Sequence, residues 1–187
     1  MELPLSIDRS LFLFFNTLPH FPVSDALALL FSGVGTAGFI WIVISIYIFF
    51  QEERKDRYFF LPVAIAAVGS WIISDIWLKS FFGRIRPTVD IGAIVVGDGA
   101  TNFSFPSTHA TFAWALALVL SRKEPRYAGW FYALAVIISL SRIYLGVHYP
   151  GDIIGGTLLG LGIGHIALEV DRFAAERRNK KTRRQRR

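Results

Sequence analysis

The chain has 187 residues and a formal net charge of +6, and 53% of its residues are hydrophobic. Water-soluble domains average about 45–50% apolar residues even with glycine counted, so this composition, with a mean hydropathy of +0.45, excludes an ordinary soluble enzyme. The absence of cysteine excludes disulfides and thiolate metal sites. We therefore expect an all-α, polytopic membrane bundle, with a membrane-embedded domain at 1–170 and a basic tail at 171–187.

The first predicted element is a short helix at residues 6–19 (SIDRSLFLFFNTLP). Its apolar side chains fall mostly on one side, with Asp8, Arg9 and Asn16 off that side. This pattern is typical of an amphipathic helix lying in the membrane interface; a solvent-facing loop and a segment that inserts into the membrane are the alternatives. Glu2 and Asp8, with no Lys or Arg among the first eight residues, argue against a secretory signal.

Five membrane-spanning helices are expected to follow, at about 22–50, 58–78, 107–121, 127–145 and 150–170. Residues 26–50, 58–74 and 153–164 contain no charged side chain, and a bilayer core of roughly 30 Å needs about 20 apolar residues per spanning helix. The third segment offers about 15 residues, or roughly 22 Å at 1.5 Å per residue. Its first residues are therefore expected at headgroup depth.

Positive charge is distributed unevenly along the chain. Fifteen of the twenty Lys and Arg residues fall in the linkers 51–57 and 121–126 and in the tail. The positive-inside rule therefore predicts a cytoplasmic tail and an outward position for residues 79–106. We expect the tail to be flexible and to bind anionic lipid, and we expect no nucleic-acid partner, which is the weaker alternative.

The last span contains Gly156, Gly160 and Gly164 at intervals of four residues. Small residues at this spacing let helix backbones approach closely in lipid. We expect close packing within the chain rather than dimerisation, and the sequence leaves the oligomeric state open.

Charged residues near membrane spans mark functional sites, because lipid excludes charge. The topology brings Lys79, Arg86 and Arg142 to the outward side, and three converging cations require an anion between them. Arg presents a planar fork that fits phosphate oxygens, and Lys adds a point charge. Pro106 and Ser107 open a helix whose first amides can bind an oxyanion, and Ser107 adds a hydroxyl.

Two histidines and a carboxylate complete the predicted site. Asp152 follows His148 by four residues across a Pro-Gly turn, so it can orient one imidazole nitrogen and leave the other to attack phosphorus. His109 is then available as the general acid. A zinc site made of His109, His148 and Asp152 is possible by residue type, but the three nearby cations argue against it.

Other polar residues have simpler interpretations. Arg84 belongs either to the site or to a membrane-interface anchor, and Asp75 offsets Lys79 as an i, i+4 pair. We interpret His20 and His165 as ordinary polar residues near helix ends. The polar loop 88–104 is expected to lie over the site.

Three motifs together resemble the signatures of the type 2 phosphatidic acid phosphatase superfamily, over about residues 71–156: Lys79-x6-Arg86-Pro87, Pro106-Ser107-Thr108-His109 and Ser141-Arg142-x5-His148-x3-Asp152. The resemblance implies phosphate-binding residues at Lys79, Arg86, Ser107, Thr108 and Arg142. It implies that His148 forms a phosphohistidine, that Asp152 orients it and that His109 protonates the leaving group, with no metal or cofactor. The sequence departs from the family pattern at Thr108, where Gly is commoner, and in having fewer than six expected spans.

These features predict a metal-independent phosphatase of the bacterial cytoplasmic (inner) membrane that acts on a lipid phosphate or pyrophosphate at the outer leaflet. We expect undecaprenyl pyrophosphate as substrate. Phosphatidic acid, phosphatidylglycerol phosphate and lipid A 1-phosphate are alternatives, as is transfer of the phosphate to an acceptor other than water. A non-enzymatic alternative is a transporter that binds a lipid phosphate, but paired interrupted helices, which such a protein would show, are not evident.

Overall fold

The computed structural model of the chain describes residues 2–35, 38–51, 58–88, 91–97 and 101–185. In these residues the regular structure is helical, without strands, which confirms the predicted all-α class. The elements in chain order are α1 (Glu2–Asn16), α2 (Pro22–Gly35), α3 (Phe39–Gln51), α4 (Phe60–Ser70), η2 (Trp71–Leu78), α5 (Lys79–Phe82), α6 (Thr108–Lys123), η4 (Pro125–Tyr127), α7 (Ala128–Tyr144) and α8 (Pro150–Gln185).

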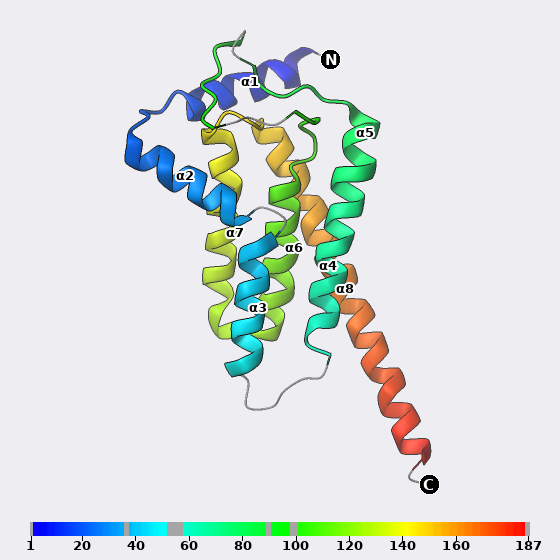
Figure 1. The fold of residues 1–187 in the computed structure, drawn as a ribbon. Helices are drawn as coiled ribbons and strands as arrows, with labels where there is room; N and C mark the ends of the chain where they lie inside the picture. The colour runs from blue at the N-terminus through cyan, green and yellow to red at the C-terminus, as the bar shows by residue number, and fades with distance from the viewer. Residues whose placement is uncertain (1, 36–37, 52–57, 89–90, 98–100, 186–187) are drawn as a thin grey trace.

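Helix α6 lies at the centre of the bundle and packs against α4, α7 and α8 (Figure 1). Side chains are buried along almost its whole length, from Ala110 to Ser121. Leu116 and Leu120 of α6 belong to the main apolar core, together with Trp41, Phe59 and Ile138. Protein rather than lipid therefore surrounds α6.

The glycines of α8 determine how closely it approaches α6. A Cβ atom on Gly156 would lie 2.6 Å from the carbonyl oxygen of Ser107, and one on Gly160 would lie 2.4 Å from that of Thr111. At Gly164 the corresponding distance to the Ala115 carbonyl oxygen is 2.7 Å. These contacts confirm that the glycine repeat serves close packing within the chain.

The expected number of five spanning helices is not confirmed. In the described residues three helices are long and apolar enough to cross a membrane: Phe60–Phe82, Pro125–Tyr144 and Pro150–Arg178. A fourth span results if α2 and α3 are counted together, although their axes are bent by 66°. Gly38, just before α3, has a φ of +73°, a conformation that favours glycine. The central α6, with 16 residues, is about 24 Å long and falls short of the bilayer core.

The predicted amphipathic segment is helix α1, which excludes the loop alternative. Figure 1 shows α1 lying across the end of the bundle where α8 begins. The fully buried Asn16 attaches α1 to its surroundings: its side-chain amide donates to the carbonyl oxygens of Ile94 (2.8 Å) and Tyr144 (2.9 Å). Its side-chain oxygen accepts a hydrogen bond from the Ile94 amide at 2.8 Å.

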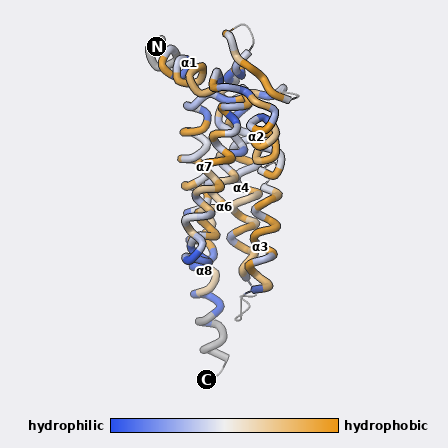
Figure 2. The backbone as a smooth tube through the Cα atoms, turned by 90° about the vertical axis from the view of Figure 1, so that its left-hand side faces the viewer, coloured by the Kyte–Doolittle hydropathy of each residue, from blue (hydrophilic) through white to orange (hydrophobic). Residues whose placement is uncertain are grey.

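The basic tail continues α8 instead of leaving the helix near residue 170. The helix extends to Gln185, and Arg172 pairs with Glu169 and Glu176, one turn before and after it. Figure 2 shows apolar residues along the bundle and hydrophilic residues on α8 beyond it. Arg54, Lys55, Arg57, Arg186 and Arg187, which contribute to the predicted sidedness, lie outside the described residues, as do positions 89–90 and 98–100 of the predicted covering loop.

Candidate active site

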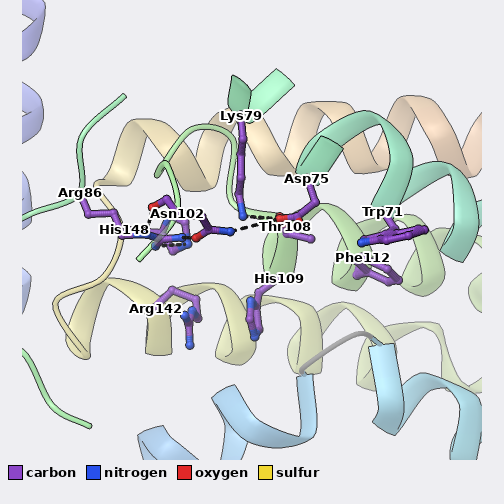
Figure 3. Close-up of a pocket in the computed structure, with 10 residues that line it drawn as sticks. All are labelled: Trp71, Asp75, Lys79, Arg86, Asn102, Thr108, His109, Phe112, Arg142 and His148. Carbon is purple, nitrogen blue, oxygen red and sulfur yellow. Dashed lines mark hydrogen bonds and ion pairs between the residues drawn. The ribbon is translucent and has the colours of Figure 1, made fainter. Parts of the chain in front are cut away.

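A cavity of about 440 Å³ is lined by residues from the start of α6, the end of α7 and the turn before α8. Figure 3 shows the side chains that line it. Its lining residues are Trp71, Asp75, Lys79, Arg86, Asn102, Thr108, His109, Phe112, Arg142 and His148. Six of the eight predicted site residues therefore meet in one cavity. The other two, Ser107 and Asp152, are fully buried next to it.

A segment of wide π-helical turns, η2, leads to the first cation. Such segments are rare and often occur at functional sites. Lys79 is almost completely buried and forms an ion pair with Asp75, as the i, i+4 spacing predicts. The same carboxylate oxygen of Asp75 accepts a hydrogen bond from the Thr108 hydroxyl at 3.1 Å and from the Asn102 amide at 3.5 Å. One oxygen of Asp75 therefore accepts from three side chains that line the cavity, those of Lys79, Thr108 and Asn102.

Arg86 is fixed by the loop that precedes α6 and by the turn that follows α7. Its guanidinium donates to the carbonyl oxygen of Val147 at 2.6 Å. It also donates to the backbone carbonyl oxygen and to the side-chain oxygen of Asn102, both at 2.7 Å. Its Nη1 also lies 3.0 Å from Nε2 of His148. Burial lowers the pKa of Arg86, and the carboxylates of Asp152 and Asp75 oppose this only in part.

His148 lies between Arg86 and Asp152. Its side chain is 2% exposed, and Nδ1 is 3.4 Å from Oδ2 of Asp152. The two atoms form an ion-pair contact without hydrogen-bond geometry, and Nδ1 has no hydrogen-bond partner within the described residues. Burial, followed by the positive charges of Arg86, Arg142 and Lys79, lowers the pKa of His148 well below its usual range. His148 is therefore a neutral imidazole at neutral pH.

Arg84 is an internal ion-pair partner and not an interface anchor. Its Nη1 donates to Oδ1 of Asp152 at 2.7 Å, and its Nη2 donates to Oδ2 of Asp8 at 2.5 Å. Burial opposes the charge of Arg84, but Asp152 and Asp8 outweigh it, so the pKa of Arg84 is raised. Asp8 lies 76 positions away from Arg84, and sequence periodicity gives no signal for this contact.

Arg142 and His109 enter the cavity from α7 and α6 (Figure 3). Arg142 is 9% exposed, and its Nη1 donates to the hydroxyl of Ser32 on α2. Within the described part of the chain its Nε has no hydrogen-bond partner. A buried guanidinium with an unused donor beside a cavity is suited to an anionic ligand.

Ser107 forms the N-cap of α6, so the helix begins at Thr108 and Pro106 lies before it rather than in its first turn, where the sequence placed it. Its side chain accepts a hydrogen bond from the Ala110 amide, and its own amide donates to the Asp152 carbonyl oxygen at 3.0 Å. The start of α6 is therefore joined to the first turn of α8, which brings His109 and Asp152 to the same end of the bundle.

The remaining histidines lie outside the cavity. His20 contacts Asp25 and the Asn16 carbonyl oxygen, both at 2.8 Å, as expected for a satisfied polar residue, and His165 is exposed on α8. Among the described residues no group of three or more His, Asp or Glu side chains is arranged to hold a metal ion. This geometry does not support the zinc alternative. The sequence did not identify Asn102 as a cavity residue, because a residue in a loop carries no periodic signal.

Residues 57–174 match the PAP2 superfamily. The chain is 31% identical to the lipid A 4'-phosphatase of Porphyromonas gingivalis, over 95% of this chain and 78% of that protein. It is 27% identical to the undecaprenyl-diphosphatase of Sulfolobus acidocaldarius, over 71% of this chain and 64% of that protein.

The fold is also similar to the crystal structure of a transmembrane PAP2-type phosphatidylglycerolphosphate phosphatase from Bacillus subtilis. The TM-score is 0.73 at 23% identity, over 92% of this chain and 88% of that one. The superfamily match over most of the chain, the helical membrane fold and the relatives' names agree with one another. The chain therefore belongs to the PAP2 superfamily of membrane lipid phosphatases.

Proposed function

We propose that the chain removes phosphate from a membrane lipid through a phosphohistidine on His148. The observation that carries this proposal is the position of His148: Nε2 faces the cavity cations, and Nδ1 faces the buried carboxylate of Asp152. A neutral imidazole with one nitrogen oriented by a carboxylate is a nucleophile of the kind that triads use.

The cavity supports a two-step reaction. Lys79, Arg86 and Arg142 bind the phosphate oxygens, with Thr108 and the first amides of α6 as further donors and Ser107 as the cap of that helix. Nε2 of His148 forms a bond to phosphorus while the bond from phosphorus to the lipid oxygen breaks. The electron pair stays on the lipid oxygen, and His109 supplies its proton. Water then attacks phosphorus and gives a proton to His109, while the N–P bond breaks and its electron pair returns to Nε2. Inorganic phosphate is released, His148 is again a neutral imidazole, and His109 is protonated for the next cycle. The protein groups supply the positive charge, so we propose that no metal takes part.

The position of the cavity supports a site near one membrane surface. The cavity lies towards the end of the bundle covered by α1, and the basic end of α8 lies at the opposite end (Figure 1). Together with the positive-inside rule, this supports an outer-leaflet site, a cytoplasmic C-terminus and a location in the bacterial inner membrane. We also propose that residues 1–170 form the phosphatase domain and that 171–187 form a basic extension.

The lipid A and undecaprenyl relatives suggest two candidate substrate classes. The match named for lipid A 4'-phosphate covers more of this chain, at higher identity, than the match named for undecaprenyl diphosphate. We therefore propose a lipid A-type phosphate monoester as the first candidate and undecaprenyl pyrophosphate as the second, because no observation specifically favours the polyprenyl substrate expected from sequence. Phosphatidic acid and phosphatidylglycerol phosphate serve as comparison substrates.

The test is release of inorganic phosphate from these four lipids by purified protein in detergent with EDTA present. We expect activity on at least one lipid, and we expect His148→Ala to abolish it. His165→Ala, a substitution on the exposed surface of α8, is the matched control and should retain wild-type activity. Activity in His148→Ala comparable to wild type would contradict the proposed nucleophile. Binding of lipid phosphate without any release would instead favour the transporter alternative.

A further inference from the structure

An ion-pair chain lies behind the His148–Asp152 pair and reaches the N-terminal helix. Arg84 bridges two carboxylates, that of Asp152 in the first turn of α8 and that of Asp8 on α1. Both carboxylates are largely withdrawn from solvent: the Asp152 side chain is 0% exposed and the Asp8 side chain 15%. The phosphate cavity is lined by other residues, and Arg84, Asp152 and Asp8 do not take part in its lining.

The oxygens of both carboxylates are occupied. Oδ1 of Asp152 accepts from Arg84, and Oδ2 accepts from the Tyr149 amide at 2.9 Å and faces Nδ1 of His148 at 3.4 Å. On Asp8, Oδ2 accepts from Arg84, and Oδ1 accepts from the Gly151 amide at 2.7 Å. The Arg84 guanidinium also lies over the Tyr149 ring, 4.3 Å from its centroid.

These contacts hold the Asp152 carboxylate in a single orientation. Its rotation is restrained by Arg84 on one oxygen and by a backbone amide on the other. Arg84 is in turn restrained by Asp8, because a planar guanidinium that bridges two carboxylates cannot turn without losing one of them. Asp8 itself is held to the first turn of α8 through the Gly151 amide.

We propose that Arg84 and Asp8 are positioning residues for phosphoryl transfer, acting through Asp152 on the imidazole of His148, so that α1 forms part of the active-site framework. This inference rests on the proposed role of His148. Neither residue touches the phosphate cavity, so their loss should slow the chemical step and leave phosphate binding by Lys79, Arg86 and Arg142 nearly unchanged.

The experiment compares kcat and KM of Arg84→Gln, Arg84→Lys and Asp8→Asn in the full-length protein, using the best lipid substrate. We expect kcat to fall roughly ten- to a hundredfold in Arg84→Gln, as misplacement of a catalytic group by about 1 Å can cause, and less in Asp8→Asn. Arg84→Lys keeps the charge but not the fork, so it should recover only part of the loss. KM and inhibition by inorganic phosphate should change by less than about twofold, since these substitutions do not touch the phosphate donors.

The matched control is Asp25→Asn on α2. Asp25 accepts from the Tyr144 hydroxyl at 2.7 Å and contacts His20 at 2.8 Å, so it stabilises the same N-terminal region without touching Asp152. If positioning is the role of Asp8, Asp25→Asn should keep the wild-type kcat even where it lowers the thermal midpoint as much as Asp8→Asn does. An equal loss of kcat in both variants would overturn the proposal.

A double-mutant cycle tests whether Arg84 acts through Asp152. In an Asp152→Asn background, the rate of phosphohistidine formation should change by less than about twofold when Arg84→Gln is added, because coupled residues are not additive. Full additivity, or wild-type kcat in both Arg84→Gln and Asp8→Asn, would overturn the inference while leaving the proposed function intact. Failure of the proposed function would appear separately, as activity retained in His148→Ala.

Discussion

Nε2 of His148 lies 3.0 Å from Nη1 of Arg86, inside the cavity that also contains Lys79 and Arg142. A guanidinium donates hydrogen bonds and cannot accept them, so Nε2 carries the lone pair and Nδ1, facing Asp152, carries the proton. This is the tautomer that attack through Nε2 requires. The lone pair therefore points at Arg86, one of the proposed phosphate-binding residues, where phosphorus would be held once a substrate enters.

The low pKa of His148 predicts activity that persists into mildly acidic solution. Protonation would remove the lone pair of Nε2, and burial together with Arg86, Arg142 and Lys79 lowers the pKa of the imidazole below its usual 6.5. The acid limb of kcat/KM, which reports groups of the free enzyme, should therefore fall below pH 6.5. The measurement is kcat/KM across pH with a lipid whose own ionisation is known.

Arg86→Gln provides the internal comparison for that profile. Removing this positive charge should raise the pKa of His148 and move the acid limb of kcat/KM to higher pH, in addition to weakening substrate binding. An acid limb at or above pH 6.5 in the wild type, unmoved in Arg86→Gln, would mean that a group other than His148 controls it.

Asp75 is expected to weaken the binding of inorganic phosphate. Its carboxylate accepts from Lys79 and Thr108, so a bound phosphate must compete with it for both donors. Asp75→Asn removes the negative charge, and the inhibition constant for inorganic phosphate should fall about three- to tenfold. Asp171→Asn, which removes a carboxylate paired with Lys123 at 3.1 Å, is the control and should not change it. Weaker inhibition in Asp75→Asn would mean that Asp75 mainly holds Lys79 in place.

Gly160→Ala should destabilise the bundle. The added Cβ would lie 2.4 Å from the Thr111 carbonyl oxygen, so α8 must move away from α6. Overpacking of this kind costs about 1–3 kcal/mol, visible as a lower thermal midpoint in detergent. Gly162→Ala is the matched control on the same helix, because its Cβ would meet no atom within 4 Å. Equal midpoints for the two variants would contradict the close α6–α8 contact.

The sequence predicted the residues of the cavity better than their surroundings. Lys79, His109, Arg142 and His148 were identifiable because charged residues at the ends of apolar segments are rare and because topology brings those ends together. The all-helical membrane fold could be predicted because the uncharged segments are long enough to form spanning helices. The bend between α2 and α3 was missed, since the uncharged run 26–50 has the same composition whether straight or bent.

Contacts between distant polar residues could not be predicted from the sequence. Arg84 was assigned to the site or to the membrane interface with equal weight, because its partner Asp8 lies on another helix. The extension of α8 was missed because positive charge was taken to indicate a flexible tail, whereas Arg172 and its neighbouring glutamates support continued helix.

The absence of cysteine from the chain makes the proposed orientation directly testable. Thr101 is exposed beside the cavity residue Asn102. Arg177 is exposed in the C-terminal part of α8, and Figure 1 shows that this end of α8 lies at the opposite end of the protein from α1. In intact spheroplasts, a membrane-impermeant maleimide should label Thr101→Cys and should label Arg177→Cys only after the membrane is permeabilised. The wild-type chain, which has no thiol, is the blank.

Both cysteine variants should retain phosphatase activity, since neither residue lines the cavity. The opposite labelling pattern would reverse the orientation expected from the positive-inside rule and place the site at the cytoplasmic leaflet. The catalytic mechanism would be unaffected, because it depends on the contacts around His148. The candidate substrates would then be limited to lipid phosphates of the cytoplasmic leaflet, and the proposed outer-leaflet site would be wrong.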